Sequence, residues 1–243
     1  MAEVKDWGLD ALTIQAANVK DFDWLAIEKV EQVEKLFKYL SLDHYLGHKF
    51  IEQSAVEIAA ENSKVIVQEL KLDERTRVEI TNGEEVPFSA KLVHIKEEPN
   101  ANGTYNLLLA LIEDGEIIVN KVEQTTAQTV ELFEPLASVK SEAPEDAVSF
   151  KAWYDSVPCL QDGCCTFSGT KYKWCGANCG SGTPVNSADT CCRTHDYCYG
   201  SFGAYPARCE CDKTLRSCLA NTSDPGSSTM RAAFWAKMVW KGC

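Results

Sequence analysis

The distribution of cysteine constrains this chain more than any other feature of its sequence. All twelve cysteines lie between Cys159 and Cys243, and residues 1–158 contain none. A single oxidised domain would not usually segregate its cysteines so completely. The cysteine density of the second half is typical of small secreted domains that are held by disulfides. The sequence therefore predicts two domains, of which only the second is a disulfide scaffold.

Charge divides at nearly the same place. Residues 1–150 carry 29 Asp and Glu against 14 Lys and Arg, a balance of −15, whereas residues 151–243 carry 7 against 10, a balance of +3. An acidic segment joined to a weakly basic one is compatible with intramolecular docking. The alternative is that the acidity only keeps the first half soluble. We expect no nucleic-acid partner for so acidic a chain. No stretch approaches the ~20 apolar residues that span a bilayer.

The first half has the periodicity of an α+β domain. Apolar residues recur at helical spacing from Asp23 to Leu42, which predicts one long amphipathic helix with a core-facing stripe. From Ala55 to Phe133 the period moves towards two, with strands at 65–67, 78–80, 88–95, 107–112, 117–122 and 130–133. We expect residues 1–136 to form a helix with an antiparallel meander curled around it, and residues 1–22 to be loose. No catalytic constellation occurs here, so we expect a propeptide, inhibitory or immunity-like domain.

Residues 137–147 are small, acidic and interrupted by Pro144, which is linker composition and a candidate site of cleavage. The second domain, residues 148–243, opens with apolar positions from Phe150 to Val157 that predict a short helix ended by Pro158. The segment from Thr229 to Lys241 combines aromatic residues with cations. Adsorption of such a helix to an anionic lipid surface and burial against its own domain both fit this pattern.

The stretch from Cys191 to Cys198 is the best candidate for a site. On a helix, Cys191, Cys192 and Cys198 fall four residues before, three before and three after His195, near the same face. Disulfides at these positions would clamp that face to its neighbours in a domain with little core. His195 and Asp196 point about 100° apart, so one can face a substrate and the other an ion.

This stretch resembles the active-site helix of the secreted phospholipase A2 superfamily, whose motif is Cys-Cys-x-x-His-Asp-x-Cys. Trp174-Cys175-Gly176, followed by Gly180-Ser181-Gly182-Thr183-Pro184, resembles the calcium-binding loop of that family. Cys209-Glu210-Cys211-Asp212 resembles its second helix, which supplies an orienting aspartate. The resemblance covers about residues 147–243 and implies a small, mainly α domain. It also implies the disulfides Cys175–Cys192, Cys191–Cys218 and Cys198–Cys211, and the other six cysteines cannot be paired from sequence.

The function implied by the resemblance is hydrolysis of the sn-2 ester of phospholipids at a membrane surface. His195 would take a proton from water, and Asp212 would accept a hydrogen bond from the other ring nitrogen. The backbone N–H of Gly176 would stabilise the oxyanion. Tyr199 and Tyr205 are candidates to hold Asp212, although we expect them to be structural.

The cofactor implied by the resemblance is Ca²⁺, which prefers oxygen ligands. The carbonyls of Trp174 and Gly176 and the carboxylate of Asp196 would supply three of them. The loop is about one residue longer than the close family pattern, so the third carbonyl stays open. It is Asn178 when counted from Trp174 and Gly180 when counted from Pro184. A loop pinned by disulfides with no ion is the alternative.

We expect a secreted zymogen for lipid degradation, because the cysteines require an oxidising compartment. The segment from Met1 to Asp6 is not a signal peptide, so we expect a signal to have been removed ahead of Met1, with another export route as the alternative. A non-enzymatic bacteriocin or toxin with an N-terminal immunity or chaperoning domain is the main alternative function. A cytosolic zinc site fits the cysteine spacing poorly and would need free thiols.

Overall fold

The computed structural model describes residues 13–16, 27–46, 52–60, 63–83, 85–126, 157–160, 163–167 and 169–243. The elements of the first half are β1 (Thr13–Ala16), α1 (Ile27–Tyr39), the 3₁₀ helix η2 (Asp43–Tyr45), β2 (Glu52–Ala60), β3 (Ser63–Lys71), β4 (Thr76–Gly83), β5 (Ser89–Ile95), β6 (Tyr105–Glu113) and β7 (Glu116–Thr125). Those of the second half are the 3₁₀ helix η3 (Val157–Leu160), β8 (Thr166–Phe167), β9 (Thr170–Lys171), α4 (Ser187–Ser201), α5 (Cys209–Ala220) and α6 (Ser227–Lys241).

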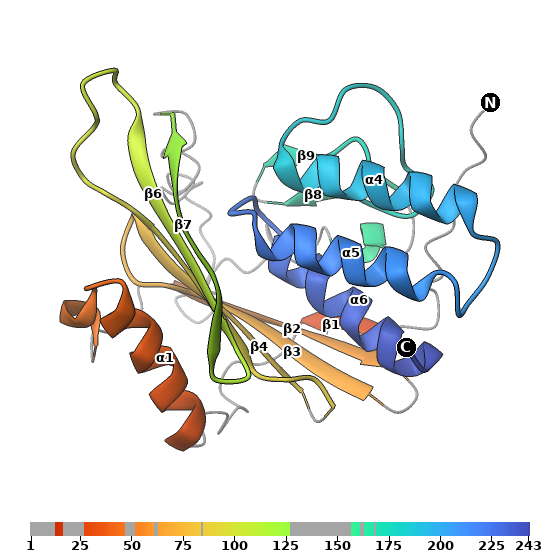
Figure 1. Ribbon diagram of the computed structural model, residues 1–243, viewed down its shortest axis with the longest axis horizontal. Coiled ribbons are helices and arrows are strands. Elements are labelled where there is room, and N and C mark those ends of the chain that lie inside the picture. The colour runs from red at the N-terminus through yellow and green to blue at the C-terminus, as the bar shows by residue number, and fades with distance from the viewer. Residues whose placement is uncertain are drawn as a thin grey trace, which may run out of the picture.

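The first half forms one antiparallel sheet whose seven strands follow one another in chain order. This confirms the expected meander. In the register, Val78 pairs with Leu92 and Leu92 with Ala110, and side chains alternate between the two faces of each strand. These three residues lie on the face that packs against Leu36 and Phe37 of α1. Figure 1 shows α1 on one side of the sheet and α4, α5 and α6 on the other.

The first two strands of the sheet, β1 and β2, were not among the expected strands. Thr13–Ala16 falls in the stretch expected to be loose, but it forms β1 and pairs with β2 from Thr13 with Ala59 to Ala16 with Val56. Four residues carry too weak a local pattern to predict a strand, and pairing with the existing sheet decides the outcome.

Pro158, expected to end a helix, lies inside η3. The linker at 137–147, the strand at 130–133 and the helix residues before Val157 lie outside the described residues.

Six disulfides hold the second half. The three expected pairs are confirmed, and the others are Cys159–Cys165, Cys164–Cys179 and Cys209–Cys243. No cysteine is free, so the thiols that a zinc site would need are absent and the zinc hypothesis is wrong. Disulfides from α4 to α5 lie on either side of His195 in the sequence, which fixes these two helices together.

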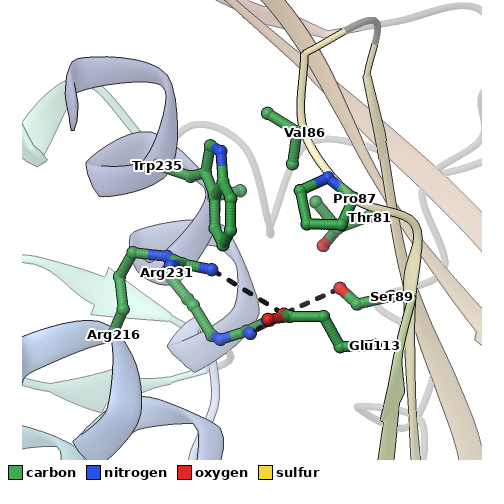
Figure 2. Close-up of a pocket in the computed structure, with 9 residues that line it drawn as sticks. Thr81, Val86, Pro87, Ser89, Glu113, Arg216, Arg231 and Trp235 are labelled. Atoms are coloured by element: carbon green, nitrogen blue, oxygen red, sulfur yellow. Dashed lines mark hydrogen bonds and ion pairs between the residues drawn. The ribbon is translucent and has the colours of Figure 1, made fainter. Parts of the chain in front are cut away.

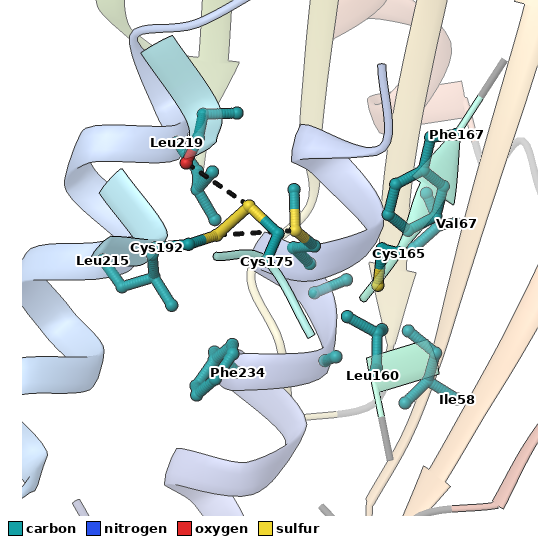
Figure 3. Close-up of a cluster of buried hydrophobic side chains, with 14 of the residues drawn as sticks. Ile58, Val67, Leu160, Cys165, Phe167, Cys175, Cys192, Leu215, Leu219 and Phe234 are labelled. Atoms are coloured by element: carbon teal, nitrogen blue, oxygen red, sulfur yellow. Dashed lines mark hydrogen bonds between the residues drawn. A yellow bond between two sulfur atoms is a disulfide. The ribbon is translucent and has the colours of Figure 1, made fainter. Parts of the chain in front are cut away.

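The apolar core of the second half is shared with the sheet. Figure 3 shows the Cys175–Cys192 disulfide among side chains that include Leu215 and Phe234, with Phe167 close to Val67 of β3. All of these side chains belong to one buried cluster, which also contains Val56, Ile58 and Val65. The disulfide-rich half therefore completes its core with strands β2 and β3.

Helix α6 lies between α5 and strands β2, β3 and β4. Of the two expectations for this tail, burial is the one that the structure bears out, with the sheet as an additional cover. Polar contacts join it to the sheet: Lys91 Nζ donates to Ser227 Oγ at 2.7 Å, Ser228 donates to Glu79, and Arg231 pairs with Glu113 and donates to Ser89 Oγ at 3.4 Å. Figure 2 shows Arg231 and Arg216 converging on Glu113 beside Trp235. Among the described residues, no helix is long and apolar enough to cross a membrane.

Candidate active site

The site begins with two crosslinked helices. Asn186 caps α4 by accepting a hydrogen bond from Asp189 N at 2.9 Å, and α4 carries His195. Helix α5 carries Asp212 in its first turn. The disulfides Cys191–Cys218 and Cys198–Cys211 join the two helices. They bring His195 Nε2 within 2.9 Å of Asp212 Oδ1, with both side chains buried.

Asp212 accepts hydrogen bonds from three side chains. Besides His195, the hydroxyl of Tyr199 donates to Oδ1 at 2.6 Å and that of Tyr205 donates to Oδ2. The expectation that these tyrosines are merely structural was wrong. Tyr199 lies four residues after His195, on the same helix face, and this spacing was the available signal. Tyr205 lies in the short connection from Phe202 to Arg208 that joins α4 to α5.

The electrostatics of Asp212 fix the state of the imidazole. Burial raises the pKa of Asp212, but the hydrogen bond from His195, the charge of Lys237 and the two tyrosine hydroxyls outweigh burial and hold that pKa below its ordinary value. An ionised carboxylate can only accept hydrogen bonds. His195 Nε2 therefore carries the proton, which leaves Nδ1 as the basic nitrogen.

The surroundings of His195 favour its neutral form. Burial lowers the pKa of the imidazole, against the opposing effect of Asp212. The ring lies between Tyr199, at 4.2 Å between ring centroids, and Phe234, at 4.7 Å and edge to face. A neutral imidazole of fixed tautomer can accept a proton from water.

The loop from Trp174 to Pro184 is anchored by Asp189, a residue that the sequence analysis missed. Asp189 is buried, and its carboxylate accepts hydrogen bonds from the backbone N–H groups of Lys173, Trp174, Cys175 and Val185. The distance from Trp174 N to Oδ1 is 2.7 Å. Asp189 stands three residues after the N-cap Asn186, where an acidic side chain can reach back to backbone ahead of the helix. That spacing was the signal available in the sequence.

The carbonyl groups of this loop divide into two sets. Those of Lys173, Cys175 and Ala177 accept backbone hydrogen bonds. Those of Trp174 and Gly176 accept no backbone hydrogen bond among the residues that the structure describes. Backbone hydrogen bonds therefore engage every second carbonyl from Lys173 to Ala177. The two carbonyls in between, those of Trp174 and Gly176, are the first two predicted calcium ligands.

Asp196 lies directly against this loop. A Cβ built on Gly180 would lie 3.3 Å from Asp196 Oδ2 and 3.2 Å from the Trp174 ring. The φ of Gly180 is +137°, in the region that favours glycine. Gly176 has a φ of +134°, and a Cβ there would meet the Gly163 carbonyl oxygen at 1.9 Å. Both glycines are thus required by close approach as well as by conformation.

The oxygen atoms of the loop carbonyls and of the Asp196 carboxylate fit a hard cation. No three His, Cys, Asp or Glu side chains gather as a metal site within the described part of the chain, so a cation here would depend on backbone oxygens. Loop carbonyls together with the Asp196 carboxylate are the oxygen ligands that Ca²⁺ prefers. Asn178 has a left-handed φ of +59° and Gly180 borders Asp196, so both registers for the third carbonyl stay open.

These features define a buried histidine–aspartate site beside an oxygen-lined loop, on a disulfide-rich helical scaffold. The Cys175–Cys192 disulfide joins the loop to α4 three residues before His195. The structure thus places the predicted catalytic pair on α4 and α5, and all the predicted ligands on the loop and on α4.

The comparisons with known proteins give relatives for the second half. The chain is 32% identical over 92 residues to the "Acidic phospholipase A2 homolog taipoxin gamma chain" of Oxyuranus scutellatus scutellatus. The aligned region covers 37% of this chain and 53% of the relative. It is 45% identical over 58 residues to a "Basic phospholipase A2" of Micrurus corallinus, which covers 24% and 38%. It is 35% identical over 60 residues to "Basic phospholipase A2 3" of Bungarus caeruleus, which covers 25% and 41%.

The chain spans about half or less of the length of these relatives. No family model matches it, and no solved structure gives a significant match. The C-terminal part of the chain is a phospholipase A2-like region. This confirms the resemblance that its three motifs carry.

Proposed function

We propose that the chain is a phospholipase A2-type hydrolase that cleaves the sn-2 ester of phospholipids. The observation that carries this proposal is the contact of 2.9 Å between His195 Nε2 and Asp212 Oδ1, in a region whose relatives are named phospholipases A2. The proposal extends to a secreted protein, since six disulfides persist only in an oxidising compartment.

The chain's own residues would run the reaction as general-base hydrolysis. His195 Nδ1 takes a proton from a water molecule while the water oxygen bonds to the ester carbonyl carbon. The N–H of Gly176 donates to the oxyanion that forms. The carbon–oxygen bond to the glycerol then breaks, and His195 returns its proton to the departing alkoxide, which leaves a free fatty acid and a lysophospholipid. Asp212 keeps the imidazole in one tautomer throughout.

Ca²⁺ is the proposed cofactor. The carbonyls of Trp174 and Gly176, the carboxylate of Asp196 and one of the two carbonyls at Asn178 and Gly180 would hold it. When bound, the ion supplies positive charge next to the ester oxygen on which negative charge develops. The position of Asp196 against the loop supports this assignment.

The phospholipid surface is the proposed partner of the second half. Val185, Tyr197 and Phe202 are large apolar residues that are 44%, 58% and 43% exposed. Tyr197 lies edge to face with Trp174 of the loop, at 5.7 Å between ring centroids. The three side chains lie along α4, which carries His195, or directly at its two ends. Exposed apolar side chains on such a helix suit contact with a membrane surface.

The N-terminal half is proposed to be a propeptide or inhibitor that docks on the second half until the linker at 137–147 is cut. The contacts of α6 with the sheet support docking, since Glu79 and Lys91 are buried and both contact serines of α6. An enzyme that attacks membranes needs such restraint before export, which makes a zymogen physically reasonable.

A fluorescent phospholipid assay tests the activity. Purified protein with intact disulfides is assayed with calcium or with a chelator, before and after cleavage of the linker. His195→Gln should lower turnover about a thousandfold without unfolding the protein, because it removes the general base. His44→Gln is the matched control, since His44 is exposed on η2, far from α4 in the sequence.

Two outcomes would count against the proposal. Wild-type protein that shows no turnover after linker cleavage, with all six disulfides in place, would exclude it. Membrane damage that persists in His195→Gln would favour the non-enzymatic bacteriocin or toxin instead.

A further inference from the structure

Helix α6 places a lysine in the hydrogen-bond network behind the catalytic pair. Lys237 is 1% exposed, and its Nζ donates to the Tyr199 hydroxyl at 2.7 Å. Lysine is almost never fully buried unless its charge is paired. The three aromatic rings around the ammonium are those of Tyr199 at 4.9 Å, Phe234 at 5.3 Å and Tyr205 at 5.4 Å.

The donors of this network converge on Asp212, from Lys237 through Tyr199 on one side and from His195 on the other. An ammonium group has three donors and no acceptor, so the Tyr199 oxygen accepts from Lys237. The phenolic proton is then free to point at Asp212 Oδ1, 2.6 Å away. Asp212 in turn accepts from His195 Nε2. Each donor polarises the next group along the chain.

We propose that Lys237 is a positioning residue for the general base, acting through Tyr199 on Asp212. Its buried charge keeps the carboxylate ionised, so that Asp212 can only accept hydrogen bonds, and this holds His195 in the tautomer with the proton on Nε2. The inference rests on the hydrolase proposed above, but it assigns a role to α6 that none of the catalytic motifs contains.

The position of Lys237 on α6 also links the site to the sheet. Phe234, three residues earlier, packs on the same imidazole, whereas Ser228 and Arg231 contact Glu79 and Glu113 of the sheet. One side of α6 therefore contacts the catalytic network and the other is held by the N-terminal half.

The experiment compares Lys237→Met with Lys241→Met in the full chain. Lys241 lies one turn later on the same helix, and its ammonium lies 3.7 Å from the Trp240 ring centroid and 5.7 Å from that of Tyr205. This control therefore removes a nearby cation without removing the hydrogen bond to Tyr199. Lys237→Met should lower kcat about tenfold, with KM and calcium affinity unchanged, because a charge-assisted hydrogen bond is lost. Lys241→Met should match the wild type.

Tyr199→Phe completes a double-mutant cycle. If Lys237 acts through Tyr199, adding Lys237→Met to Tyr199→Phe should lower kcat no further. Independent effects that multiply in the double variant would overturn the proposal, as would a Lys237→Met enzyme with the kcat of Lys241→Met.

A second readout needs no turnover. The His195 Nε2 proton, hydrogen-bonded to a carboxylate, should give a downfield proton NMR resonance. That resonance should move upfield in Lys237→Met and stay in place in Lys241→Met. If Lys237→Met does not fold, Tyr199→Phe must move the resonance in the same direction, and an unmoved line overturns the proposal. An inactive wild type would remove the hydrolase assignment, and the resonance would still decide the role of Lys237.

Discussion

The two halves of this molecule hold their elements together by different means. The seven strands of the first half are joined by backbone hydrogen bonds and contain no cysteine, whereas the helices of the second half are crosslinked by six disulfides. Yet the apolar cluster around Cys175–Cys192 includes Val56, Ile58 and Val67 of the sheet. Crosslinks fix the local geometry of the site, and the sheet supplies burial that a small helical domain lacks.

The contact between the halves depends on buried charges. Glu79 lies 3.5 Å from Arg77 Nε and 3.7 Å from Lys91 Nζ, and all three side chains are at most 8% exposed. Glu113 is shared by Arg231 and Arg216. Buried ion pairs add little net stability against an apolar interface, but breaking one leaves an expensive uncompensated charge. Such pairs select one register of α6 on the sheet.

Reduction of the disulfides should have the largest effect, and it tests whether the halves are separate. Each native disulfide contributes about 2–5 kcal/mol in a small domain, so reduced protein should lose amide protection in α4 and α5 while β4, β5 and β6 keep theirs. Hydrogen exchange followed by mass spectrometry at increasing reductant measures this. If both regions lose protection at the same reductant concentration, the shared core makes the chain one cooperative unit.

Glu79→Ala should have the next largest effect, and it tests the contact between the halves. Lys91 and Arg77 would stay buried without their carboxylate, which should lower the free energy of unfolding by about 3–5 kcal/mol. Glu210→Ala is the control, because Glu210 and Lys213 form an exposed pair, 75% and 47% accessible, whose loss should cost under about 1 kcal/mol. Urea unfolding of the oxidised variants compares them, and equal effects would contradict the argument.

The titration of Lys91 should give the smallest effect. Burial lowers the pKa of Lys91 to about 8 from its ordinary 10.5, although Glu79 opposes the shift. Between these values the unfolded chain holds a proton that the folded chain has lost, so stability rises with pH in that window. The difference in unfolding free energy between wild type and Lys91→Met should therefore shift in favour of the wild type from pH 8 towards 10.5. A constant difference across that range would show that Lys91 keeps its proton in the folded state.

Much of the site was predictable because its chemistry follows local spacing. His195, Asp196 and three cysteines fall on one helical stretch. Asp212 was assigned by the resemblance of Cys209-Glu210-Cys211-Asp212 to a family motif, and the disulfide from Cys211 to α4 places it. Asp189 was missed, although it stands three residues after a helix cap. Tyr199 was expected to be structural, although it stands four residues after His195. Lys237 had none, because nothing in Thr229 to Lys241 says which neighbour will cover which side of that helix.

The sequence alone determined the strands from residue 63 to 125 through their apolar period, and the candidate catalytic pair through short motifs that resemble those of phospholipases A2. Both kinds of pattern lie within a few residues of chain. Only the tertiary structure decided that Thr13–Ala16 joins the sheet, that α6 is covered by β2, β3 and β4, and that Lys237 meets Tyr199. These are contacts between segments far apart in the chain. Their energies depend on how complete faces fit together, which no short pattern records.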